Sequence, residues 1–177
     1  MSCENRRPAD LPPLSQRLAA FPAAPADDAA CMQLALREAE AAREEDEVPV
    51  GAILVCGGHI IAASHNRREG RRCATCHAEL TAIEESCRAL GGWRLPDSTL
   101  YVTLEPCPMC AGAALNARVG RVVYGAADPR GGALGSLCDL AALPFNHRML
   151  VTRGVEEEAC RQVLTDYFRA KRRTQQG

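Results

Sequence analysis

From Val48 onward the chain alternates short apolar segments with segments of helical periodicity, and this alternation restricts the fold more than any other feature. Two strand-like segments, 48–56 and 59–65, flank Gly57-Gly58, which favours a tight β-hairpin. The pattern further predicts helices at 27–47, 77–92, 108–120 and 156–172 and strands at 98–104, 121–126 and 148–154. Because strands that alternate with helices form parallel units, we expect an α/β protein, a three-layer α/β/α sandwich around a five-stranded mixed sheet.

We expect a single folded domain over residues 28–173, because a chain of 177 residues with 47% hydrophobic residues is typical of one globular domain. Residues 1–27 contain five prolines and many alanines, so a flexible extension is predicted there, with at most a short docked turn around Leu14 and Leu18. Residues 174–177 are expected to form a disordered tail. No apolar run approaches the roughly 18 residues of a membrane span, and no export signal is recognisable, which predicts a cytoplasmic protein without a membrane partner.

Ten cysteines stand out in a chain of this size. In the reducing compartment expected here disulfides are rare, so the thiols need another explanation. Five cysteines lie in apolar or amphipathic patterns and are expected to be small buried residues, namely Cys31, Cys56, Cys87, Cys138 and Cys160. Cys3 lies in the extension. The other four form two C-x-x-C pairs, Cys73 with Cys76 and Cys107 with Cys110, which are candidates for metal binding or redox chemistry.

Two of the predicted helices begin with residues of types that commonly bind metals, histidine and cysteine. Cys107 and Cys110 are spaced i, i+3 in the first turn of one helix, where the positive end of the helix stabilises the thiolate form. His77 begins the preceding long helix. These three residues offer three ligands to a tetrahedral zinc ion and leave one position for water, as in catalytic zinc sites. Glu79 follows His77 by two residues and is a candidate proton carrier that does not bind the metal.

Each of these residues also has a plainer explanation when taken alone. His77 could be an ordinary surface or core histidine, Glu79 a first-turn glutamate placed for the helix dipole, and the Cys107 pair a redox centre. Their joint occurrence at two helix starts argues against these explanations. A sharper alternative is a structural zinc site formed by Cys73, Cys76, Cys107 and Cys110. It would leave His77 and Glu79 without a role.

The segments H-A-E (77–79) and P-C-P-M-C (106–110) match the H-x-E…P-C-x-x-C signature of the cytidine deaminase-like zinc deaminases, a superfamily that includes the tRNA adenosine deaminases. The chain resembles the bacterial tRNA-specific adenosine deaminases more closely still, over residues 28 to 173. The segments that carry this resemblance are EVPVGAILV (47–55), NRREGRRCATCHAELTAI (66–83), LYVTLEPCPMCAGAALNARVGRVVYGAADPRGGALGSL (100–137), FNHR (145–148) and DYFRAKR (166–172).

This resemblance implies a cytidine deaminase-like fold and a homodimer that hydrolyses adenosine to inosine at the wobble position of a tRNA anticodon, with one zinc ion per subunit. It implies that His77, Cys107 and Cys110 hold the zinc. Glu79 would take a proton from the attacking water and protonate the purine ring and the leaving ammonia. The substrate contacts that it implies are Asn66, Val50, the backbone of Ala78, Asp128 and Phe168. Val50, Asp128 and Phe168 also suit a strand core, a turn and a helix anchor, respectively.

The chain departs from the family at one point inside the motif. Cys73-Ala74-Thr75-Cys76 stands where the family usually has Asp-Pro-Thr-Ala. We predict that Cys76 is a small buried residue and not a ligand. Two further functions stay open: deamination of a free nucleobase or nucleoside such as guanine or cytosine, and a non-catalytic Cys₄ zinc protein.

The net charge of −1 conceals one acidic segment and two basic segments, whose charges largely cancel. Residues 27–47 hold eight acidic and two basic residues, 66–72 hold four arginines and one glutamate, and 161–173 hold five basic residues and one acidic residue. Either basic segment alone could be an ordinary solvated surface. Together they favour a tRNA anticodon stem-loop as the partner, because contacts to phosphates supply much of the affinity for RNA. The residues expected to contact the RNA backbone are Arg67, Arg68, Arg169 and Arg172.

Overall fold

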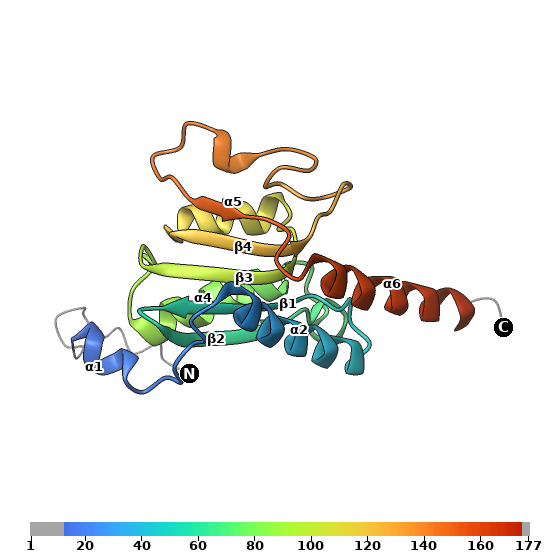
Figure 1. Ribbon diagram of the computed structural model, residues 1–177, viewed down its shortest axis with the longest axis horizontal. Coiled ribbons are helices and arrows are strands. Elements are labelled where there is room, and N and C mark those ends of the chain that lie inside the picture. The colour runs from blue at the N-terminus through green and yellow to red at the C-terminus, as the bar shows by residue number, and fades with distance from the viewer. Residues whose placement is uncertain (1–12, 175–177) are drawn as a thin grey trace.

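Two layers of helices enclose one five-stranded sheet in the computed structural model, which describes residues 13–174 (Figure 1). The strands are β1 (Gly51–Cys56), β2 (His59–His65), β3 (Ser98–Leu104), β4 (Arg121–Ala126) and β5 (Leu150–Thr152). They lie in the order β2-β1-β3-β4-β5. Strand β1 is antiparallel to β2 and β3, whereas β3, β4 and β5 run parallel to one another. The expected mixed sheet is confirmed.

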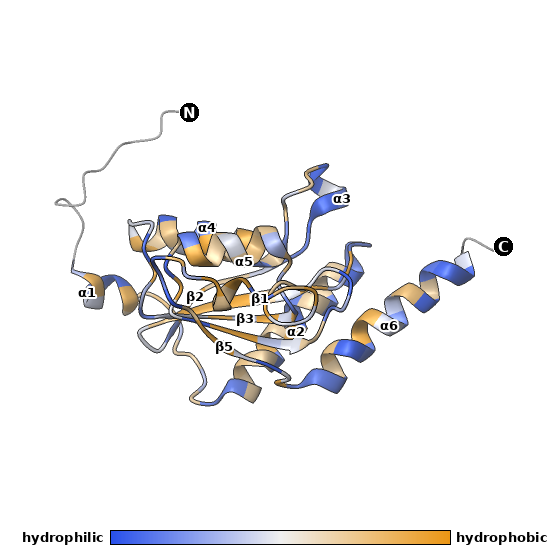
Figure 2. Ribbon diagram, turned by 90° about the horizontal axis from the view of Figure 1, so that it is seen from above, coloured by the Kyte–Doolittle hydropathy of each residue, from blue (hydrophilic) through white to orange (hydrophobic). Residues whose placement is uncertain are grey.

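The long helices lie on opposite faces of the sheet (Figure 2). Helices α4 (Ala78–Leu90) and α5 (Pro108–Asn116) cover one face, and α2 (Asp28–Glu44) and α6 (Glu157–Thr174) cover the other. Three short helices complete the fold: α1 (Leu14–Leu18), α3 (Arg68–Arg71) and the 3₁₀-helix η2 (Leu140–Ala142). The three-layer α/β/α sandwich is therefore confirmed. Over residues 13–174, no helix combines the length and apolarity needed to cross a membrane.

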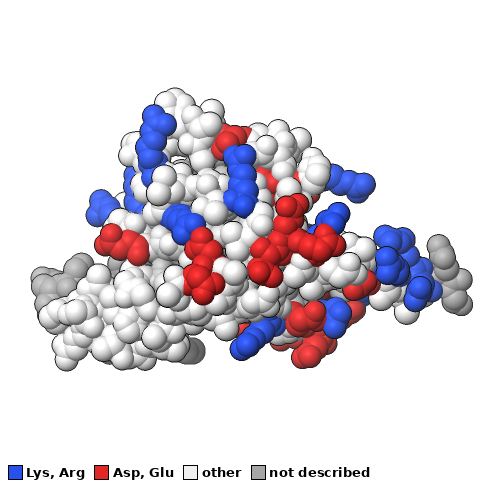
Figure 3. Space-filling view, in the orientation of Figure 1, with Lys and Arg blue, Asp and Glu red and all other residues white. Residues whose placement is uncertain are grey.

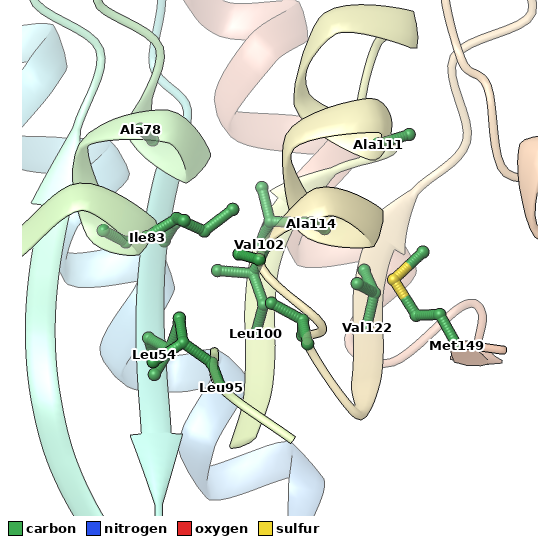
Figure 4. Close-up of a cluster of buried hydrophobic side chains, with 14 of the residues drawn as sticks. Leu54, Ala78, Ile83, Leu95, Leu100, Val102, Ala111, Ala114, Val122 and Met149 are labelled. Atoms are coloured by element: carbon green, nitrogen blue, oxygen red, sulfur yellow. The ribbon is translucent and has the colours of Figure 1, made fainter. Parts of the chain in front are cut away.

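Apolar side chains pack on both faces of the sheet, because neighbouring residues of a strand point to opposite sides. On β1, Leu54 belongs to the core beneath α4 and α5, and its neighbour Ile53 belongs to the core beneath α2. Figure 4 shows the first of these cores, in which Ala114 of α5 lies over Leu100 and Val102 of β3. This packing holds the first turns of α4 and α5 at the same end of the sheet.

The element boundaries differ from the predicted ones where local chemistry ends an element. Strand β1 begins at Gly51 and not at Val48, because Pro49 has no N–H to pair with a neighbouring strand. Helix α5 ends at Asn116, four residues before the predicted end, and Arg118 then takes a positive φ of 61°. The Gly57-Gly58 turn is confirmed, with φ values of 55° and 76° that suit glycine. Residues 68–71, predicted as loop, form the single-turn helix α3.

Residues 13–27 lie along the β1–β2 hairpin. The Ala24 N–H donates to the Gly58 carbonyl at 2.8 Å, and the Ile60 N–H donates to the Pro22 carbonyl at 2.9 Å. These contacts cover part of the free edge of β2. The predicted domain limits and the flexibility of the extension stay predictions, since residues 1–12 lie outside the described range. At the other end Thr174 belongs to α6, and 175–177 lie outside the described range.

Candidate active site

The first turns of α4 and α5 bring the predicted metal ligands together. His77 is the residue that precedes α4, Cys107 the residue that precedes α5, and Cys110 lies in the first turn of α5. Strand β3 leads into α5, so Cys107 follows the carboxyl end of this strand. Asp128 follows the carboxyl end of β4, the parallel neighbour of β3. Ligands commonly bind at this end of α/β sheets.

The three ligand atoms have the spacing that a zinc ion requires. Nδ1 of His77 lies 3.9 Å from Sγ of Cys107 and 3.7 Å from Sγ of Cys110. All three atoms lie within 4.8 Å of one another. Tetrahedral zinc with bonds of about 2.3 Å to sulfur and about 2.1 Å to nitrogen would set neighbouring ligand atoms roughly 3.6–3.8 Å apart. The residues therefore fit a bound zinc ion.

The alternative Cys₄ zinc site is not supported by this arrangement. Within the described range, the group of His, Cys, Asp and Glu residues close enough to hold a metal contains His77, Cys107 and Cys110 but neither Cys73 nor Cys76. Cys73 instead lies with its sulfur 3.3 Å from the Thr75 hydroxyl.

Electrostatics also prepare the site for a cation. Hydrogen bonds from Cys110 and His77 lower the pKa of Cys107 to about 3, which makes it a thiolate. The hydrogen bond to Cys107 in turn raises the pKa of His77. The Cys110 pKa is raised by its contact with Cys107 and by burial. A divalent cation would relieve this competition, because it stabilises both thiolates at once.

Glu79 lies beside the three ligands without belonging to them. Its side chain is 3% exposed, and burial raises its pKa. One carboxylate oxygen, Oε2, has no hydrogen-bond partner among residues 13–174. An unpaired buried oxygen costs stability, and this one is available to exchange a proton with a group in the cavity.

A cavity of about 150 Å³ lies in front of these residues. Its wall contains the predicted residues Val50, Asn66 and Asp128 together with Glu79 and two of the three ligands. The full lining is Val48, Val50, Asn66, Arg68, His77, Glu79, Leu104, Glu105, Cys107 and Asp128. Residues from five separate segments of the chain therefore meet at one cavity.

Asn66 connects this cavity to the start of α4. Its Oδ1 accepts the N–H of Ala78 at 3.0 Å, and its Nδ2 donates to the Val48 carbonyl at 3.2 Å. The Ala78 carbonyl accepts the Ser64 hydroxyl at 2.7 Å. Both backbone groups of Ala78 thus have partners within the protein, and the expected contact of this backbone with a base stays a prediction.

The remaining predicted contacts lie around a second hollow that adjoins the cavity, since Val48 lines both. This hollow is lined by Glu45, Asp46, Val48, Glu69, Tyr167, Phe168, Lys171 and Arg172. Phe168 is 44% exposed and packs its ring edge-to-face against Tyr167 at a centroid distance of 5.3 Å. Figure 3 shows Lys and Arg side chains gathered at the end of α6. Arg67 pairs with Glu45 of this lining at 3.2 Å, and Arg68 lines the cavity itself.

Comparison with known proteins identifies the family. The sequence model of the MafB19-like deaminases matches residues 26–172. The chain is 52% identical to the tRNA-specific adenosine deaminase of Bacillus subtilis over 143 residues, which is 80% of this chain and 89% of that protein. It belongs to the tRNA-specific adenosine deaminases. The family member from Agrobacterium fabrum is 48% identical over 80% of this chain and 93% of its own length.

Solved structures place this deaminase nearer to the tRNA enzymes than to the guanine deaminases. A structure described in studies of A-to-I editing by tRNA:A34 deaminases superposes with a TM-score of 0.74 at 47% identity, and covers 76% of this chain and 98% of that one. The guanine deaminase of Nitrosomonas europaea superposes at 0.70 with 26% identity, and covers 94% of this chain and 98% of that one. The cytidine deaminase-like fold is confirmed by these neighbours.

In this deaminase the prediction for Cys76 is wrong in one respect. Cys76 is only partly buried, because it lies in a turn at the surface. In this turn the Cys76 N–H donates to the Cys73 carbonyl at 3.2 Å. Its carbonyl accepts the Arg67 N–H at 3.1 Å, so its backbone supports the segment that carries Asn66.

Replacement of Cys76 by alanine should leave zinc binding intact. We expect Cys76→Ala to retain one zinc ion per subunit and His77→Ala to lose it, because only His77 lies near Cys107 and Cys110. Atomic absorption on dialysed protein measures both. Loss of zinc in Cys76→Ala with retention in His77→Ala would contradict this ligand set.

Three residues of the cavity were not predicted from the sequence, namely Val48, Leu104 and Glu105, and of these Glu105 carries a charge. Glu105 stands directly before the P-C-P-M-C segment, just after the carboxyl end of β3. An acidic residue next to this segment is the sequence feature that could have indicated its place in the site. Burial acts to raise its pKa, but hydrogen bonds from Ser136, Asp128 and Leu134 outweigh burial and hold the pKa below its usual value. Glu105 is therefore ionised and is held by the loop that follows β4.

Proposed function

We propose that this deaminase converts adenosine 34 of tRNA to inosine by zinc-dependent hydrolysis. The single observation that carries this proposal is the buried Glu79 carboxylate, with one oxygen free, beside the close group of His77, Cys107 and Cys110. Relatives at 43–52% identity are named tRNA-specific adenosine deaminases, which supports a tRNA substrate over a free base.

The residues of the cavity divide the chemistry among them. His77, Cys107 and Cys110 would hold the zinc ion, which when bound makes a water molecule more acidic. Glu79 would accept a proton from the attacking water as the water oxygen bonds to C6 of adenine, and would deliver this proton to the ring nitrogen N1. Glu79 would then carry the proton of the hydroxyl group now on C6 to the amino group, so that the C6–N6 bond breaks, a C6 carbonyl forms and ammonia leaves. The balance is adenosine plus water to inosine plus ammonia.

Asn66, Val50 and Asp128 would hold the base in the cavity once it has turned out of the anticodon stack. The amide of Asn66 offers a hydrogen bond, and Val50 offers an apolar surface to the ring. The Ala78 backbone would read the edge of the base only after exchange of its present partners, Asn66 and Ser64. The narrow cavity favours one flat base and leaves the rest of the anticodon loop outside.

The second hollow is the proposed platform for the anticodon loop. Phe168 presents an exposed ring on which an unpaired base can stack. Arg67 and Arg68 on one side and Arg169 and Arg172 on the other would contact phosphates. The Arg67 side chain would then exchange its pairing with Glu45 for a phosphate.

Substitution of two of these arginines should weaken binding through charge alone. For Arg169→Ala/Arg172→Ala we expect the magnitude of the slope of log K against log salt for an anticodon stem-loop to fall by about 1.4 to 1.8, because each lost phosphate contact removes roughly 0.7–0.9 from it. Fluorescence anisotropy at several salt concentrations measures this. An unchanged slope would contradict the assignment of these residues to the RNA surface. The control is Arg88→Ala, because Arg88 pairs with Glu84 on the surface of α4 and should not contact the RNA.

We further propose that two copies associate through α4 and α5. An apolar groove lies between these helices and is lined by Leu80, Ile83, Glu84, Cys87, Trp93, Ala113, Asn116 and Ala117. Trp93 is more than half exposed there, which is unusual for a free surface. The groove lies on the helices whose first turns hold the ligands, so a second copy would stand close to the site.

A charge introduced into this groove should separate the copies. We expect sedimentation to give a dimer for the natural chain and a folded monomer for Ala113→Arg, because an arginine would be buried against an apolar partner surface. Ala63→Arg, at an exposed position of β2, should remain a dimer. A monomeric natural chain would refute the dimer.

The compartment that we propose is the reducing cytoplasm. All nine cysteines of the described range are free thiols. The prediction that five of them are buried holds for Cys31, Cys56 and Cys160, but Cys87 is only partly buried and Cys138 is exposed. An oxidising compartment would endanger the two thiolate ligands.

A substrate panel tests the proposed function. Purified protein is incubated with a tRNA that carries adenosine 34 and, separately, with guanine, cytosine and free adenosine. We expect inosine in the tRNA and no ammonia from the free compounds. Ammonia from guanine or cytosine without inosine in the tRNA would favour the free-base deaminase instead.

A further inference from the structure

The carboxylate of Glu105 is enclosed by a single loop, residues 128–136. The side chain is 2% exposed. Its Oε1 accepts the N–H groups of Leu134 and Ser136, each at 3.0 Å. Its Oε2 accepts the N–H of Asp128 at 3.1 Å and the hydroxyl of Ser136. Three backbone groups and one side chain of the same loop therefore converge on one buried charge.

These bonds leave Glu105 little capacity for the substrate. Each oxygen already accepts two hydrogen bonds, which is the usual capacity of a carboxylate oxygen. Glu105 lines the cavity, but the group aimed at proton transfer there is Glu79, whose Oε2 has no partner in the described range. The two buried carboxylates of the cavity thus have different tasks, and that of Glu105 concerns the loop.

The loop is shaped to fit the carboxylate closely. A Cβ placed on Gly132 would lie 2.3 Å from the Glu105 carboxyl carbon and 2.7 Å from the Asp128 carbonyl oxygen. The Gly132 N–H donates to that same carbonyl at 2.8 Å, and the Ala133 N–H donates to the Pro106 carbonyl, also at 2.8 Å. The loop is thereby joined both to Glu105 and to the residue that precedes Cys107.

The first residue of the 128–136 loop belongs to the wall of the proposed substrate cavity. Asp128, whose N–H donates to Glu105, lines the same cavity as Asn66, and its own Oδ1 accepts the Arg130 N–H at 3.0 Å. An amide nitrogen in place of either carboxylate oxygen would set an N–H group against one or two of the loop N–H groups, and the loop would shift to find other partners. Displacement of a positioning group by about 1 Å can cost about 100-fold in rate.

We propose that Glu105 is a positioning residue, which fixes the 128–136 loop so that Asp128 forms the outer wall of the substrate cavity. Glu105 does not touch the substrate and acts on it only by holding Asp128 in place. This inference rests on the proposed function for its kinetic part, whereas its structural part concerns the loop alone.

The test uses the full-length, zinc-loaded protein and the substitution Glu105→Gln, which keeps the shape and removes the charge. We expect kcat/KM for an anticodon stem-loop to fall by about 30- to 100-fold with zinc content unchanged. In an Asp128→Ala background the same substitution should cost less than about 3-fold, because residues that act through one another are not additive. A full, multiplicative cost in that background would overturn the proposal.

Hydrogen exchange provides a readout that does not depend on activity. In Glu105→Gln the amides of Asp128, Leu134 and Ser136 should exchange faster, and the Gly70 amide should not, because it donates to Glu47. Glu47→Gln is the matched control: Glu47 is an equally buried carboxylate that accepts an N–H of the single-turn helix α3, so its loss should expose the Gly70 amide and spare the 128–136 loop. Unchanged exchange of the 128–136 amides in Glu105→Gln would overturn the proposal even if activity falls.

A second variant displaces the carboxylate without removing it. Gly132→Ala should reproduce the loss of kcat/KM and the faster exchange, whereas Gly92→Ala, which meets no atom within 4 Å, should match the natural chain. Circular dichroism and zinc content show that each variant is folded. If the natural chain forms no inosine, the proposed function fails, but the exchange measurements still decide whether Glu105 holds the loop.

Discussion

Glu79→Gln should abolish nearly all deamination while the protein keeps one zinc ion per subunit. General acid–base catalysis contributes about 10² to 10⁴ in rate, and Glu79 is the carboxylate of the cavity with a free oxygen, so we expect a loss of at least about 10³-fold. Glutamine has nearly the same volume but cannot carry a proton between water and the base. Inosine formation under single-turnover conditions measures the loss, and atomic absorption measures the zinc.

The control for this substitution is Glu158→Gln on α6. Glu158 is exposed and pairs with Arg161, three residues further along α6, so its replacement should leave the rate within about 2-fold. A Glu79→Gln protein that retains most of its activity would show that another group transfers the proton. Loss of zinc from this variant would instead show that Glu79 belongs to the metal site.

Cys107→Ser should lose both zinc and activity while the fold remains. The Cys107 thiolate is one of the three proposed ligands, and replacement of even an outer partner of a metal ligand costs about 10- to 100-fold in affinity, so we expect zinc affinity to fall by more than about 100-fold. Serine is among the preferred residues at the position before a helix, and Cys107 occupies that position of α5. The helix should therefore form as before.

Competition with a chelator measures this affinity, and circular dichroism monitors the fold. Cys138→Ser is the matched control, because Cys138 is an exposed thiol outside the ligand group and its loss should change neither zinc nor activity. Full zinc binding by Cys107→Ser would contradict the ligand set. It would reopen the question of which thiols bind the metal.

The fold could be predicted because its signals are local. Apolar periodicity, the glycines of the hairpin and the stop at Gly91 each specify an element from neighbouring residues. The boundaries that differed depend on contacts across the chain. Helix α3, for example, holds its Gly70 N–H against the buried Glu47 carboxylate, 23 residues earlier in sequence, and nothing within its four residues indicates this partner.

The grouping of His77, Cys107 and Cys110 beside Glu79 could be predicted because these residues form a compact pattern at two helix starts. Asn66 and Asp128 came only from the family resemblance, since a single Asn or Asp in a loop carries no chemical pattern of its own. Glu105 could not be predicted as a loop anchor, because its role depends on four hydrogen bonds to residues 23 to 31 positions away. Such convergence is visible only once the chain has folded.

Sequencing of the RNA product tests the central claim most directly. A tRNA with adenosine at position 34 and adenosines elsewhere in the anticodon loop is incubated with the zinc-loaded protein, and inosine is mapped by reverse transcription. We expect inosine at position 34 alone, with one ammonia released per tRNA, and none of either with Glu79→Gln. Ammonia released from free guanine, with position 34 still adenosine, would contradict the account.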